Sequence, residues 1–135
     1  MDTNETLSLV LCSGTDDRLT GAAVLVVGAA AMERPVEVLL QFWALDAFRA
    51  DRITKDHGVS PEAGTEGKAR WDRHTGTHWS EMLRQARGIG NVSIHACSLS
   101  MDVLGIDQDD LDPLVDDVRG VAAFLASADG GITFV

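Results

Sequence analysis

The cysteine at position 97 has neighbours that suit thiol chemistry. Cys97 ends an apolar segment, and the stretch that begins at Ser98 has helical character. If a helix starts there, with Ser98 as a possible N-cap, its amide donors and the positive end of its dipole would stabilise a thiolate. His95, two residues earlier on the same strand face, either adds a positive charge or, as we favour, is simply hydrogen-bonded in place. These features make Cys97 a candidate nucleophile, although a buried cysteine is more often an inert small hydrophobe.

A second group of candidate residues follows two other apolar segments. Cys12, Ser13 and Gly14 end the first segment, and Trp43 follows the second. In open parallel sheets, functional residues lie at the carboxyl ends of the strands. We therefore expect these residues near Cys97. Cys12 is either a packing residue, as most strand-end cysteines are, or a second thiol.

Two other groups of residues give a weaker indication of a functional site. His74 and His78 have the i, i+4 spacing of metal ligands on a helix, but Gly76 weakens that helix and solvated loop histidines are the better interpretation. A dense acidic cluster lacks the glycine and the final glutamate of a calcium loop, which favours a solvated helix start. That cluster comprises Asp107, Asp109, Asp110, Asp112, Asp116 and Asp117. The sequence therefore predicts no metal site and no cofactor.

Composition limits the partners and the compartment. The 135 residues fit one domain, 1–135, and 45% hydrophobic residues can supply its core. A formal net charge of -10 disfavours nucleic acid and anionic lipid as partners. The apolar run 19–32 is too short to span a membrane. Two distant cysteines and an acidic start unlike a signal peptide lead us to expect a reducing cytoplasmic setting.

Alternating apolar and helical segments predict the elements that position these residues. We expect strands at 7–12, 36–42, 91–96 and 132–135, and helices at 16–31, with Thr15 as N-cap, at 78–87 and at 98–104, with one or two more within 109–127. Residues 50–77 are polar, with little apolar periodicity, which predicts either a mobile insertion or lid, or a plain surface loop. The pattern is that of an α/β domain with a mostly parallel sheet of about five strands and helices on both faces, layered as in Rossmann-like and flavodoxin-like proteins.

The segment from Cys97 to Ile106 resembles the C-x-x-S-M-D-V-x-G-I stretch of DsrE/DsrF-like proteins, some of which are described as peroxiredoxin-family. Shorter segments are similar as well, namely Leu11-Cys12-Ser13-Gly14, Gln41-Phe42-Trp43-Ala44-Leu45 and Gly120-Val121-Ala122-Ala123-Phe124-Leu125 followed by Ala128-Asp129. The resemblance covers most of the chain except residues 50–77. It adds Met101, inside the motif, to the candidate binding residues.

The resemblance implies a sulfur carrier or sulfurtransferase that holds a persulfide on Cys97. It also implies a homo-oligomer, a trimer or a multiple of one, with rhodanese-like sulfur donors and TusA-like acceptors as partners. Two alternatives stay open. One is a thiol redox or peroxidase-like protein in which Cys12 resolves an oxidised Cys97, although the Pro-x-x-x-Thr-x-x-Cys pattern of peroxiredoxins is missing. The other is a non-catalytic oligomer that binds a small ligand.

Overall fold

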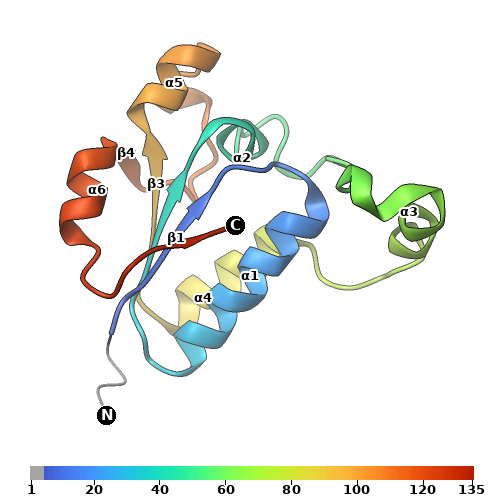
Figure 1. The fold of residues 1–135 in the computed structure, drawn as a ribbon, viewed down its shortest axis with the longest axis horizontal. Coiled ribbons are helices and arrows are strands. Elements are labelled where there is room, and N and C mark those ends of the chain that lie inside the picture. Colours follow the sequence, from blue (N-terminus) through green and yellow to red (C-terminus); the bar gives the residue numbers. More distant parts are fainter. Residues whose placement is uncertain (1–4) are drawn as a thin grey trace.

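A single five-stranded sheet organises the protein in the computed structural model, which describes residues 5–135. Residues 1–4 of the acidic start lie outside the described part. The strand order is β4-β3-β2-β1-β5 and every pairing is parallel (Figure 1). The strands are β1 (Leu7–Leu11), β2 (Val36–Leu40), β3 (Val92–Cys97), β4 (Asp117–Arg119) and β5 (Thr133–Phe134). The predicted parallel α/β architecture is confirmed.

Helices cover both faces of this sheet, but very unequally. The long helices α1 (Asp16–Ala31) and α4 (Trp79–Ile89) lie on one face, whereas only the short helix α6 (Val121–Ser127) lies on the other (Figure 1). The larger hydrophobic core fills the space beneath α1 and α4, where alanines of α1 are buried. Thr15 occupies the N-cap position of α1, as predicted, but its side chain makes no capping hydrogen bond.

Two short helices follow the central strands at their carboxyl ends. Helix α2 (Phe42–Ala47) follows β2, and α5 (Ser98–Leu104) follows β3. Phe42 therefore opens a helix rather than ending β2, which corrects the predicted bounds of that strand. Gly105 ends α5 at φ 66°, a left-handed conformation that favours glycine, and the predicted stop of this helix is confirmed.

The polar segment 50–77 contains regular structure. It holds a 3₁₀ turn (Pro61–Ala63) and the helix α3 (Gly64–Asp72), so the prediction of a stretch without elements was wrong. Helix α3 has no buried residue and therefore shows no apolar periodicity. Exposed ion pairs four residues apart, such as Lys68 with Asp72 at 2.7 Å, lie along its surface. The segment is anchored elsewhere, through the buried side chains of Ile53 and Ser60.

The chain between α5 and α6 differs most from expectation. In place of a first helix within 109–127 it forms a 3₁₀ turn (Gln108–Asp110) and the edge strand β4. Carboxylates of the acidic cluster hold this connection, since Asp112 pairs with Arg84 and Asp116 with Arg87. The predicted solvated helix start is present at the 3₁₀ turn, which Asp107 caps, but the prediction is wrong for Asp112 and Asp116. A strand of three residues at a sheet edge leaves too short a pattern to detect.

Gly14 provides a test of how the β1–α1 turn is packed. A Cβ atom at this position would lie 2.3 Å from the backbone carbonyl oxygen of Trp43, whereas a Cβ atom at Gly21 in α1 would meet nothing within 4 Å. We expect Gly14→Ala to lower the free energy of unfolding by about 1–3 kcal/mol through overpacking. Gly21→Ala should raise it by about 0.5–1 kcal/mol through helix propensity. Urea denaturation of both variants measures this, and equal effects would contradict the close approach.

Candidate functional site

Cys97 is the last residue of β3 and occupies the N-cap position of α5. The predicted arrangement of a strand-end cysteine before a helix is therefore present. The prediction that Ser98 is the N-cap was wrong. Ser98 is the first helical residue, and its side chain is exposed. The Cα atom of Cys97 pairs in register with that of Arg119 on β4. Since register partners in a sheet point to the same face, a guanidinium group extends from the position beside the thiol.

The side chain of Cys97 is nevertheless closed to solvent. Only 1% of its surface is exposed, and it packs in a small cluster with Val10, Leu39 and Phe124. Val10 and Leu39 come from β1 and β2, so the strands supply the floor of this cluster and Phe124 of α6 supplies its cover. In this arrangement the Cys97 side chain is shielded from solvent by Phe124 and the strand residues.

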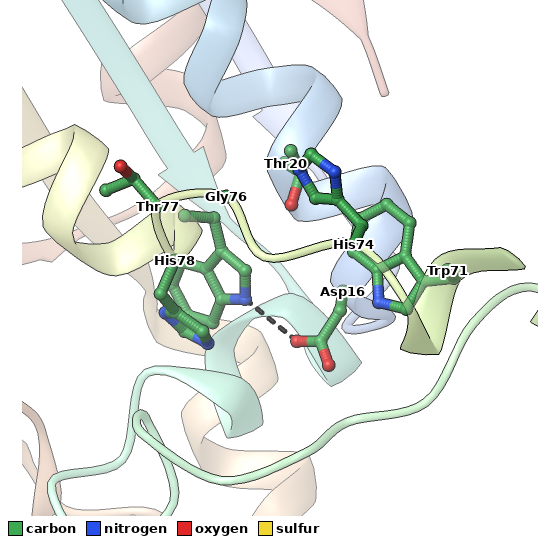
Figure 2. A pocket seen from close by; sticks show the side chains of 8 residues that line it. Asp16, Thr20, Trp71, His74, Gly76, Thr77 and His78 are labelled. Atoms are coloured by element: carbon green, nitrogen blue, oxygen red, sulfur yellow. Dashed lines mark hydrogen bonds between the residues drawn. The ribbon is translucent and has the colours of Figure 1, made fainter.

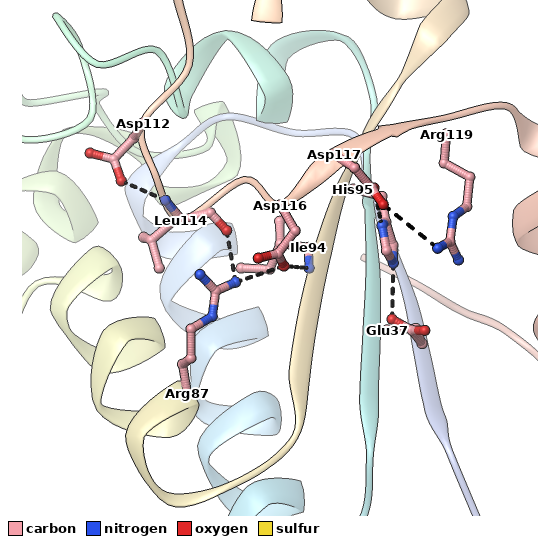
Figure 3. A network of polar contacts seen from close by, with 9 residues as sticks. All are labelled: Glu37, Arg87, Ile94, His95, Asp112, Leu114, Asp116, Asp117 and Arg119. Carbon is pink, nitrogen blue, oxygen red and sulfur yellow. Dashed lines mark hydrogen bonds and ion pairs between the residues drawn. The ribbon is translucent and has the colours of Figure 1, made fainter. Parts of the chain in front are cut away.

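His95 lies on the same face as Cys97 and crosslinks three strands (Figure 3). Its Nε2 is 2.9 Å from a carboxylate oxygen of Glu37 on β2, and its Nδ1 contacts Asp117 on β4. Both ring nitrogens can donate at once only in the imidazolium form, because a neutral imidazole carries one N–H. The interpretation that His95 is hydrogen-bonded in place is confirmed, and its partners fix the edge strand β4 to the sheet.

Cys12 lies in a separate groove at the β1 end of the same edge. This groove is lined by Cys12, Ser13, Arg18, Trp43, Phe134 and Val135. Trp43 and Phe134 are exposed, at 63% and 67%, and Cys12 itself is only partly buried. Ser13, Gly14 and Trp43 also line an adjoining hollow that reaches Arg52 and His57. Three of the five predicted binding residues, Ser13, Gly14 and Trp43, are thus gathered around Cys12, whereas Ser98 follows Cys97.

The sheet order keeps the two cysteines apart. Strand β2 lies between β1 and β3, with Leu11, Leu40 and Ala96 in register. Two strand spacings put the Cα atoms of residues at this level about 10 Å apart, beyond the roughly 7 Å that a disulfide tolerates. The strands that carry the two cysteines are therefore not neighbours in the sheet. The side chain of Met101 packs in the larger core and not in the cluster around the Cys97 side chain.

A third hollow, which was not predicted as a site, lies beneath the polar segment 50–77. A cavity of about 180 Å³ is lined by Asp16, Thr20, Trp71, His74, Gly76, Thr77, His78 and Trp79 (Figure 2). At its floor the buried carboxylate of Asp16 accepts hydrogen bonds from the indole N–H of Trp79 and the backbone N–H of His57, both at 2.9 Å. His74 and His78 thus border one cavity. Within residues 5–135, no three histidine, cysteine, aspartate or glutamate side chains are grouped closely enough to hold a metal ion.

Several residues of these sites were not predicted from the sequence. Phe124 carries a local signal, since it is the one aromatic residue of a helix made of small and aliphatic residues. Glu37 and Asp117 carry none, because they lie far apart in the sequence and meet only through His95. Asp16 was expected in the first turn of α1, but its burial follows from Trp79, 63 residues away.

Comparisons with known proteins give a family match, one uncharacterized sequence relative and one solved structure of unknown function with a similar fold. Residues 68–133 match the model of the DsrE/DsrF/DrsH-like family. The uncharacterized protein YrkE of Bacillus subtilis (strain 168) is 27% identical over 150 aligned positions, which cover 92% of this chain and 91% of that protein. The structure of the protein of unknown function MTH1491 from Methanobacterium thermoautotrophicum superposes with a TM-score of 0.61 at 19% identity, over 96% of both chains. The last similarity shows a shared fold.

No helix in the described part of the chain combines the length and apolar character needed to cross a bilayer.

His78 makes stability depend on pH. Its Nδ1 caps α4 by accepting from the backbone N–H of Ser80 at 3.1 Å. Burial, aided by His57 and Arg84 and opposed by Asp16, lowers the pKa of His78 below its usual value. The unfolded chain then binds more protons than the folded one, so this histidine withdraws stability as pH falls through about 6.5.

We expect His78→Asn to reduce the loss of stability between about pH 7 and pH 5, because asparagine keeps a capping oxygen and does not titrate. Urea denaturation at both pH values measures the difference. His74→Asn, at an exposed histidine, is the control. An unchanged pH dependence in His78→Asn would contradict the assignment.

Proposed function

We propose that the protein carries sulfur as a persulfide on Cys97, since residues 68–133 match the model of the DsrE/DsrF/DrsH-like family. The observation that carries the proposal is the position of Cys97, at the carboxyl end of β3, directly before α5 and inside the matched range. Arg119, in register with Cys97, is the cation best placed to attract a thiolate or a persulfide anion. The reaction requires no cofactor, and a reducing cytoplasm would keep the thiol free.

The proposed transfer conserves electrons at each step. The Cys97 thiolate attacks the outer sulfur of a donor persulfide, the donor sulfur–sulfur bond breaks, and the donor leaves as a thiolate. An acceptor thiolate then attacks the outer sulfur held on Cys97, and Cys97 leaves as a thiolate in turn. Rhodanese-like donors and TusA-like acceptors are the protein classes that we propose for these roles.

The separation of the cysteines favours a carrier over a redox pair. A peroxidase-like cycle needs Cys12 to form a disulfide with oxidised Cys97, and β2 lies between them. In the carrier mechanism Cys97 works alone, and Cys12 is a partly exposed second thiol in its own groove.

Loading with sulfur tests the carrier role. We expect wild type and Cys12→Ser incubated with inorganic polysulfide to gain the mass of one sulfur atom on Cys97, and Cys97→Ser to lose that gain. Intact-mass and peptide-mass analysis locate the added sulfur. If Cys97→Ser loads to the same extent as wild type, the carrier assignment fails and the small-ligand-binding function replaces it.

We also propose self-association into a trimer or a multiple of one, through the outer face of α1. Val24 and Leu25 are exposed there, at 55% and 45%, between the small residues Gly21 and Gly28. An apolar stripe of this kind on a helix favours burial against another copy.

We expect light scattering at micromolar concentration to give the mass of the assembly for wild type and the mass of a monomer for Leu25→Glu. The matched control is Val103→Glu, at an apolar residue of α5 that is 62% exposed. A monomeric wild type, or dissociation by Val103→Glu alone, would contradict this interface.

A further inference from the structure

The cover over Cys97 is part of a segment that crosses one whole face of the sheet. β4 and β5 lie at opposite edges, so the chain between them must pass over the three strands in between. Residues 120–132 make this passage, and α6 is its only helix. We call residues 120–132 the strap. On this face the strap is the only helical cover among the described residues, as α1 and α4 lie on the other side (Figure 1).

The strap is held down by one side chain. Phe124 is 1% exposed and is the single buried residue of α6. All other residues of the helix are exposed, including Val121 and Leu125 at 39% and 53%. Phe124 packs on Cys97, Leu39 and Val10, and its ring faces that of His95 edge-on with 6.4 Å between centroids.

The rest of the strap supplies little independent stability. A helix of seven residues is not stable in water without packing. Beyond it the chain turns at Gly131, which adopts φ 84° and so takes a conformation that glycine reaches without strain. The contact of Phe124 with the sheet therefore decides whether α6 stays in place.

From these contacts we infer that α6 is a gate. When the Phe124 ring leaves its contacts with Val10, Leu39 and Cys97, the thiol becomes accessible while the rest of the sheet stays folded. The inference rests on the proposed role of Cys97 and names how access to it is regulated. The residues beneath the Phe124 ring belong to β1, β2 and β3, and the opposite faces of these strands contribute to the larger core. Opening uncovers Cys97 beside Arg119 and His95, and closing shields a loaded persulfide from water and from stray thiols.

Alkylation by N-ethylmaleimide measures the opening without any sulfur chemistry. In wild type we expect Cys97 to react more slowly than the partly exposed Cys12, with both sites followed by peptide mass. The Cys97 rate should change little with urea below the unfolding transition, because a local opening exposes little surface. A Cys97 rate that rises with urea as steeply as global unfolding does, or that falls as protein concentration rises, would overturn the gate.

A pair of truncations separates the gate from general loss of stability. We expect Phe124→Ala to accelerate alkylation of Cys97 at least tenfold and to leave the Cys12 rate unchanged. The matched control is Phe48→Ala, which removes a fully buried ring from the larger core, where Phe48 packs on Trp79 at 5.0 Å between centroids. Equal acceleration in both variants would overturn the inference. If Phe124→Ala does not fold, the urea dependence of wild type decides.

The two proposals fail separately. If wild type does not load sulfur but its Cys97 alkylation rate changes little with urea, the carrier role is rejected and the gate is kept. Normal loading with alkylation that requires global unfolding would reject the gate and keep the carrier role.

Discussion

The placement of β4 and β5 at opposite edges of the sheet is the constraint on which the surroundings of Cys97 depend. A chain that must cross one face between these edges covers that face with whatever residues it carries, here a single short helix. Burial of the Phe124 side chain stabilises the covered state by about 1.5–3 kcal/mol. A domain of this size unfolds globally at a cost of about 5–15 kcal/mol. The face that carries Cys97 is thus closed by an interaction much weaker than the fold itself.

At the edge formed by β4, the same face is stabilised by hydrogen bonds and ion pairs of carboxylate groups rather than by apolar burial. β4 has three residues and cannot hold its position by backbone pairing alone. His95 binds it through Asp117 and reaches across to Glu37, while Asp116 accepts from the backbone N–H of Ile94 and from Arg87 (Figure 3). These contacts fix the start of the strap even though its helix is weakly attached. A firmly held end and a weakly held helix are the mechanical requirements of a hinged cover.

Strand order also divides the carboxyl edge of the sheet into two separate thiol environments. Cys12 lies open between exposed aromatic rings, and Cys97 lies closed beneath Phe124, with β2 between them. In the carrier mechanism that we propose, this division leaves Cys97 to work alone, and the second thiol of each transfer comes from another protein. The residues that the sequence placed in one site belong to both environments, with Met101 in neither.

The sequence by itself determined the local elements and the chemistry available to them. The helix 16–31, the strand ending at Cys97, the helix after it and its stop at Gly105 follow from periodicity, turn residues and glycine conformation, which act within a few residues. Tertiary structure alone decided which elements meet. It set β2 between the cysteines, buried Cys97 under Phe124, joined Glu37 to Asp117 through His95, and gave a short charged segment the role of edge strand β4. Those outcomes depend on the order in which strands pair, and that order is fixed by the total burial and hydrogen bonding of the whole sheet, which no single segment encodes.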